Sequence, residues 1–128
     1  MKIQTAWVVS SNRSESFFNP DRGGADSGLH SSAVAVIFRN GATKYINPGN
    51  PYLPFGKLQW YQEGAFAMVL DETGYQWKRL PISNYPETSA RRTGKFKLLE
   101  DGTLEGTVTL EYIGHSASLR RTGQYRES

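Results

Sequence analysis

The chain has 128 residues, which suits one domain or two small ones, and it contains no cysteine. These residues therefore form no disulfide or cysteine-based zinc site and supply no cysteine nucleophile. The net charge is +3, and 15 basic residues are scattered among 12 acids, whereas nucleic-acid binders usually gather basic side chains on one face. A nucleic-acid partner is therefore disfavoured, and a nucleic-acid or sugar binder that uses exposed aromatic side chains and the arginine doublets stays open as a third alternative. We also expect no membrane partner, because the sequence shows no apolar run of spanning length and no signal peptide at its start.

The first half of the chain predicts three strands. Residues 3–10 are apolar and rich in β-branched side chains, which indicates a buried strand. Residues 12–29 are rich in Ser, Asn, Asp and Gly, which predicts a long loop. Residues 31–38 are too apolar for a strand with one wet face, so we expect a central strand. The pair Asn40-Gly41 then signals a type I′ turn, and residues 33–47 are predicted to form a β-hairpin.

The stretch INPGNPYLPFG, residues 46–56, follows that hairpin directly. Its density of proline and glycine is incompatible with a helix interior or a central strand, so it must be a loop. The loop also contains aromatic side chains, which leaves two interpretations open. It is either a structural turn that aromatic side chains pack down, or the remnant of a catalytic corner.

The second half predicts further strands at residues 65–70 and 75–80, joined by a turn, and then an extended linker at 81–89. Residues 90–99 and 104–113 alternate around Asp101-Gly102, which predicts a hairpin over residues 95–113 with one solvated face. A short helix is expected from His115, followed by a frayed end. The predicted fold is mainly β and antiparallel, with one domain at residues 1–63 and a second at residues 64–128.

Few residues of this chain could carry chemistry. His30 lies between the long loop and the predicted central strand, where it is either a catalytic or ligand histidine or one that bonds to backbone. Asn47 ends the partner strand, so the hairpin can bring it close to His30, where an amide could fix the imidazole tautomer. The simpler interpretation is that Asn47 starts the turn before Pro48. His115 is expected at the surface.

No cofactor or metal is expected. The acidic residues fall in predicted turns, where solvated carboxylates are common, and Gly23-Gly24 does not follow a strand as a phosphate loop would. Aromatic residues could be stacking platforms for bases or sugars, or core plugs between two β layers. These residues are Trp60, Tyr61, Phe66 and Trp77.

Three segments, which are spread over nearly the whole length of the chain, resemble bacterial transglutaminase-like proteins. AWVVSSNR is similar to the strand and arginine written pvLvstR in that family. HSSAVAVIFRNGATKYINPGNPYLPFG resembles the catalytic hairpin, which normally ends in LDATDPYLPFG. EDGTLEGTVTLEYIGHSASLRR looks like a small β domain of unknown function that often follows the core. PYLPFG is the most specific part of the resemblance.

The resemblance implies a papain-like fold whose active site combines Cys, His and Asp. His30 matches the catalytic histidine, and Asn47 stands at the position of the aspartate. A neutral amide stabilises an imidazolium less than a carboxylate does, although it can still orient the ring. The cysteine has no counterpart, because its helix would precede Met1. Tyr52, Phe55 and Trp60 are the candidate binding residues.

We therefore expect a C-terminal fragment containing the β half of the core at 1–63 and a small antiparallel β domain at 64–128. Alone it would not be an enzyme, whereas the full-length protein could be a thiol-dependent hydrolase or acyl transferase acting on peptides or amides. The alternative is a catalytically dead module that binds a protein or the cell wall. The expected partners are an upstream helical half, another protein or a second copy, because the split core would expose apolar surface. The resemblance suggests the periplasm.

Overall fold

The computed structural model describes residues 3–22 and 28–127, and the fold is mainly β and antiparallel, as predicted. The chain divides into two compact units, Met1–Ile82 and Ser83–Ser128. The first contains β1 (Gln4–Ser10), the 3-10 helix η1 (Pro20–Arg22), β2 (Ser31–Ile37), β3 (Thr43–Ile46), β4 (Phe66–Asp71) and β5 (Gly74–Arg79). The second contains the 3-10 helix η3 (Tyr85–Glu87), β6 (Ser89–Leu98), β7 (Leu104–Ile113) and α1 (His115–Glu127).

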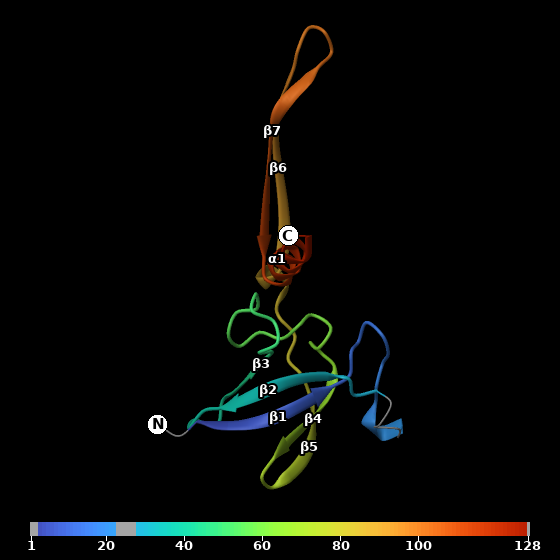
Figure 1. The fold of residues 1–128 in the computed structure, drawn as a ribbon, viewed down its shortest axis with the longest axis vertical. Helices are drawn as coiled ribbons and strands as arrows, with labels where there is room; N and C mark the ends of the chain where they lie inside the picture. The colour runs from blue at the N-terminus through green and yellow to red at the C-terminus, as the bar shows by residue number, and fades with distance from the viewer. Residues whose placement is uncertain (1–2, 23–27, 128) are drawn as a thin grey trace. The chain divides into compact units, whose positions relative to one another are not determined.

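The first unit is built on one antiparallel sheet with the strand order β3-β2-β1-β4-β5 (Figure 1). The central strand is β1, which comes first in the chain and pairs with β2 on one side and β4 on the other. β2 lies inside the sheet between β1 and β3, in agreement with its continuous apolar sequence.

One face of this sheet carries the core of the first unit. Alternate residues of β1, β2 and β4 point into it, and most of them are alanine or valine. Small side chains let the covering layer approach closely. That layer is the loop of residues 47–65 rather than a second sheet, and it contributes Leu58, while Leu80 follows β5; both are 2% exposed. The buried strand residues are Ala6, Val8, Ala33, Ala35, Ala67 and Val69.

The boundary between the units lies after Ile82, not after residue 63 as the sequence suggested. β4 pairs with β1 from Trp7–Leu70 to Ser10–Ala67, and β5 pairs with β4. Residues 64–82 therefore complete the first sheet. The change in sequence character at Gly64 marks the end of the covering loop, since Gly64 has a positive φ of 71° and its N–H donates to the Leu80 carbonyl.

The turn between β2 and β3 is not of type I′. A type I′ turn needs a positive φ at both central residues, yet among the described residues only glycines have one. Gly41 has φ 82° and donates to the Phe38 carbonyl, while the Phe38 N–H donates to the Ala42 carbonyl. This is a three-residue loop, a type I turn followed by a glycine bulge, and the same arrangement closes the β6–β7 hairpin at Gly102.

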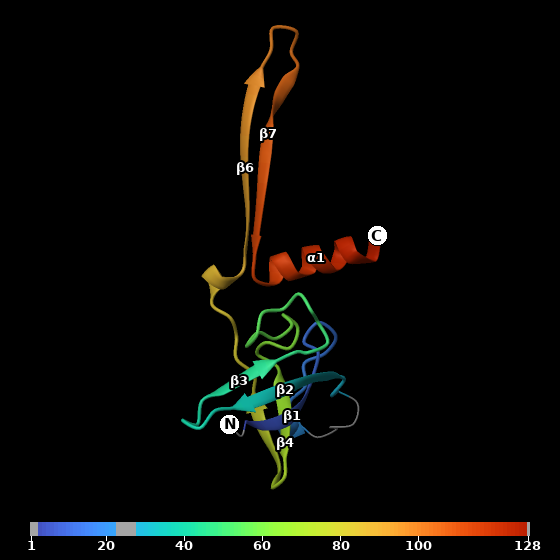
Figure 2. The same cartoon turned by 60° about the vertical axis from the view of Figure 1, so that its left-hand side comes forward.

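The second unit is dominated by the two-stranded ribbon of β6 and β7 (Figure 2). The hairpin was predicted, but both of its faces are exposed, not one. Its polar face carries cross-strand pairs such as Arg91 with Glu111. Its apolar face includes Phe96, whose ring covers Gly94 and Gly106, so that a side chain at either glycine would collide with it. The ring replaces packing that the glycines cannot supply.

The helix α1 is longer than predicted, because it continues to Glu127 where a frayed end was expected. It begins after Gly114, whose φ of 60° turns the chain out of β7. His115 is buried, contrary to the surface position predicted for it, and its backbone N–H lies 3.3 Å from the Thr88 hydroxyl. The tight turn at Gly114 places the first helical residue against the η3–β6 junction.

Candidate functional site

The two residues predicted to carry chemistry lie at the same end of the β2–β3 pair. His30 immediately precedes β2 and is exposed, and Asn47 immediately follows β3 and is half-buried. The last register pair is Val34 with Ile46, so the next step places Asn47 opposite Ala33, three residues after His30. The hairpin thus brings the two positions to one corner of the sheet. That the His30 ring meets the Asn47 side chain stays a prediction.

The Asn47 side chain is held by Gln62, a residue that is fully buried. The Asn47 amide donates to Gln62 Oε1 at 2.9 Å. The Gln62 amide in turn donates to the Ser31 hydroxyl at 2.9 Å and to the Ser32 carbonyl at 3.1 Å. Gln62 therefore ties the end of β3 to the start of β2, next to His30.

The orientation of the Asn47 amide is fixed from both ends. Its nitrogen donates to Gln62, and its oxygen accepts the Gly49 backbone N–H at 3.0 Å. This oxygen starts the turn that leads into the PYLPFG loop, as the simpler interpretation of Asn47 requires. An amide oxygen has two lone pairs, so the same atom retains the capacity to accept a second donor such as an imidazole N–H.

Sequence reasoning missed Gln62. A single glutamine in the segment QWYQEG has no motif around it, and its role depends on partners 15 to 31 residues away. Only an indirect feature of the sequence points to a buried role for this glutamine. The loop lies over small apolar strand residues, and a polar side chain entering that layer must find partners for all its hydrogen-bonding groups.

The three aromatic residues predicted to bind a ligand all lie in the covering loop, and each contacts a different neighbour. The Lys44 ammonium lies 5.7 Å from the centre of the Phe55 ring, and the Arg13 guanidinium lies 5.7 Å from the Trp60 ring. Tyr52 is half-buried and its N–H donates to the Asn50 side chain. Phe55 alone is mostly exposed, at 63%. The aromatics therefore help to shape the loop, and their role in binding stays a prediction.

The second face of the five-stranded sheet is apolar and partly open. Trp7 on the central strand lies between Val34 and Leu70, which are its partners on β2 and β4. Its side chain is 62% exposed, although it stands at the middle of the sheet. Met68 and Trp77 face each other farther along the same face, where Phe18 packs against Trp77 with 5.5 Å between ring centres. This face therefore leaves a large aromatic side chain exposed to solvent at the centre of the sheet.

The described residues include no cluster of acidic, histidine or cysteine side chains that could hold a metal ion. Within the same part of the chain, no helix has both the length and the apolar character needed to cross a membrane. The chain matches no protein-family model, and no curated protein or solved structure matches it significantly. The likeness to transglutaminase-like proteins therefore rests on the quoted sequence segments.

Proposed function

We propose that this chain is the β part of a transglutaminase-like protein, is not an enzyme by itself, and works by packing the open face of its sheet against a helical partner that carries a cysteine. The observation behind this proposal is the exposure of Trp7 among apolar neighbours on the central strand. A helix laid across β1 would cover that surface. The family resemblance supplies the identity of the occupant, because transglutaminase-like cores pair such a sheet with a helical half.

The proposed chemistry is acyl transfer or hydrolysis of a peptide or amide. The partner's thiol attacks the substrate carbonyl carbon, His30 takes the thiol proton and passes it to the leaving amine, and Asn47 orients the imidazole. The Gln62 hydrogen bond supports this role for Asn47, because it holds the amide at the corner of the sheet that His30 shares. The chain itself contains no cysteine and so cannot supply the nucleophile.

Site-specific photo-crosslinking in the native host tests the proposal. The photoreactive residue p-benzoylphenylalanine replaces Trp7 on the open face, and the matched control replaces Arg39 in the exposed β2–β3 turn. We expect an adduct from position 7 only, joined to a helical segment that contains a cysteine. Labelling of that cysteine by a thiol-directed acylating probe should then fall when His30 is replaced by alanine.

A second function is favoured by the exposed apolar face of the β6–β7 ribbon, on which Phe96, Leu98 and Val108 are each more than half exposed. In this case the chain is a catalytically dead module that binds a protein or the cell wall. Crosslinks from position 96 but not from position 7, or binding to isolated cell-wall sacculi that is lost on replacement of Phe96 by serine, would establish the second function and overturn the first.

A further inference from the structure

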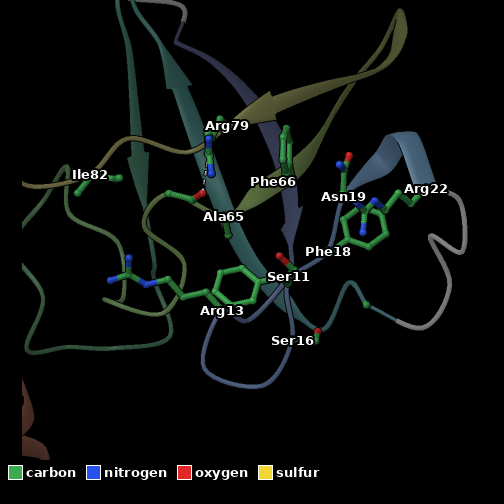
Figure 3. A pocket seen from close by; sticks show the side chains of 13 residues that line it. Ser11, Arg13, Ser16, Phe18, Asn19, Arg22, Ala65, Phe66, Arg79 and Ile82 are labelled. Atoms are coloured by element: carbon green, nitrogen blue, oxygen red, sulfur yellow. Dashed lines mark hydrogen bonds between the residues drawn. The ribbon is translucent and has the colours of Figure 1, made fainter.

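A hollow of about 650 Å³ opens in the first unit, where β1 and β5 end and β4 begins (Figure 3). Its walls come from the loop after β1, from the start of β4 and from the segment that leaves β5. The lining combines two kinds of side chain, guanidinium groups and apolar groups. The residues used below are Arg13, Arg22, Arg79, Phe18, Phe66 and Ile82.

The charge around this hollow is one-sided. Three arginines line it, and no aspartate or glutamate is among the lining residues that the structure describes. All three arginines are exposed, so a solute can reach them. Like charges that share a concave surface raise its potential and concentrate anions there. An arginine also presents five N–H donors in a planar fork, which suits carboxylate and phosphate oxygens.

Two of the arginines flank a single residue, Gly64. Arg79 Nε donates to the Gly64 carbonyl at 3.0 Å, and its guanidinium lies 5.3 Å from the centre of the Phe66 ring. Arg13 Nη1 lies 4.0 Å from the position that a Cβ atom on Gly64 would occupy. The Arg79 guanidinium is held by the Gly64 carbonyl and the Phe66 ring, and the Arg13 guanidinium lies near the same glycine and 5.7 Å from the centre of the Trp60 ring. Guanidinium groups that are already positioned lose less entropy on binding.

The apolar wall of the hollow stands beside these donors. The Phe18 ring packs against the Trp77 ring, with 5.5 Å between ring centres. It also lies close to Gly28, where a Cβ atom would come within 2.9 Å of the ring. Phe66 carries Arg79 over its ring, and Ile82 packs against Gly64. A ligand with a charged head and a ring or short alkyl body would match both parts, since binding pockets combine apolar walls with a few placed polar groups.

We propose that this hollow binds a small organic anion, a carboxylate or a phosphate monoester, whose charged head lies between Arg13 and Arg79 and whose aromatic or aliphatic body packs against Phe18 and Phe66. The proposal does not rest on the helical partner proposed above, and the Phe18 wall adjoins the sheet face that this partner would cover. Arg22 stands at the rim of the hollow and adds to its positive potential.

The proposal is tested by titrating the whole chain with 3-phenylpropionate and with phenyl phosphate, following backbone amide signals by NMR. Neutral 3-phenylpropanol is the matched probe without the charge. We expect at least one anion to bind with a dissociation constant of about 1 mM or below, as suits a ligand of about ten heavy atoms, and the alcohol to bind at least tenfold more weakly. The stronger of the two anions identifies the preferred head group, and the affinity should fall as salt is added.

Two variants locate the site. Arg79→Gln and Arg13→Gln should each weaken anion binding by about tenfold, and Arg39→Gln in the β2–β3 turn is the matched control that should leave it unchanged. Tryptophan emission shows whether each variant still folds, and the second arginine keeps the test decisive if one replacement unfolds the unit. The proposal is overturned if neither anion gives saturable shifts, if the alcohol binds as well, or if both folded variants bind the anion as tightly as the original chain.

Discussion

Replacing Gln62 with methionine tests whether the buried amide holds the corner of the sheet at which His30 and Asn47 lie. Methionine has a similar length and shape and no strong hydrogen-bonding group, so it keeps the packing and removes the network. In the folded chain the Gln62 amide donates to Ser31 and Ser32, while its oxygen accepts from Asn47 and from the Gln59 backbone. Each of these partners loses a hydrogen bond in the variant.

The cost follows from which partners water can reach. Ser32 is exposed and Asn47 is half-buried, so both can bond to water after small movements. The Ser31 hydroxyl is buried at 9% exposure, and the Gln59 N–H belongs to a half-buried residue of the covering loop. An unmade hydrogen bond at a buried group costs about 1–3 kcal/mol, so the buried Ser31 and the half-buried Gln59 together give a loss of about 3 kcal/mol in the free energy of unfolding.

Urea unfolding followed by tryptophan emission measures this loss cleanly, because Trp7, Trp60 and Trp77 all belong to the first unit. With a slope of about 1.5 kcal/mol per molar urea, the midpoint should fall by about 2 M. The matched control is Gln76→Met on the exposed edge strand β5, for which a change below about 0.5 kcal/mol is expected. If Gln62→Met and this control shift the midpoint equally, the network does not stabilise the corner.

Two further predictions concern the turns and the ribbon. Phe96→Ala should destabilise the β6–β7 ribbon by about 1 kcal/mol, because the ring no longer covers the two glycines; amide exchange along both strands should speed up while tryptophan emission stays unchanged. Hydrogen bonds from the Thr73 hydroxyl and then from its backbone lower the pKa of Asp71, which is fully exposed. The pKa of Asp71 is lower in the folded chain than in the unfolded chain, where it is about 4. The ionised Asp71 carboxylate therefore stabilises the β4–β5 turn fully above that pH, and this stabilisation is lost as the pH falls through the folded pKa. An NMR titration of the carboxyl carbon should show this lowered pKa and its return towards the ordinary value in Thr73→Ala.

Each of these two predictions can fail. Unchanged exchange along β6 and β7 in the Phe96 variant, with Phe55→Ala as the matched exposed phenylalanine in the first unit, would mean that the ring does not support the ribbon. An Asp71 pKa at or above its ordinary value would show that the Thr73 hydrogen bonds do not form in solution.

The sequence was most informative where structure depends on near neighbours. β2 and β3 are separated by a short glycine turn, and their apolar and β-branched residues identify them as strands without knowledge of the rest of the chain. The turn type was wrong because the preference of Asn-Gly for type I′ competes with a type I turn plus bulge, which needs a positive φ only at the glycine. Both turns join the same strands, so the hairpin was still predicted correctly.

Long-range pairing was beyond the sequence pattern. β4 bonds to β1, about 60 residues earlier in the chain, and nothing in the local alternation shows which strand will be its neighbour. The domain boundary was therefore placed at Gly64, where the composition changes, instead of after Ile82. The burial of His115 was missed for the same reason, since it depends on the η3–β6 junction 27 residues before it.

The central place of β1 also sets the order in which this sheet can assemble during synthesis. β1 emerges first, yet its second edge stays unpaired until β4 has been made, and Asp71 ends that strand. At about 5–20 residues per second, roughly three to twelve seconds separate the end of β1 from the end of β4. The β2–β3 hairpin can close within this interval, whereas the middle of the sheet must wait. Any factor that binds nascent chains therefore has longest access to the strand that carries Trp7.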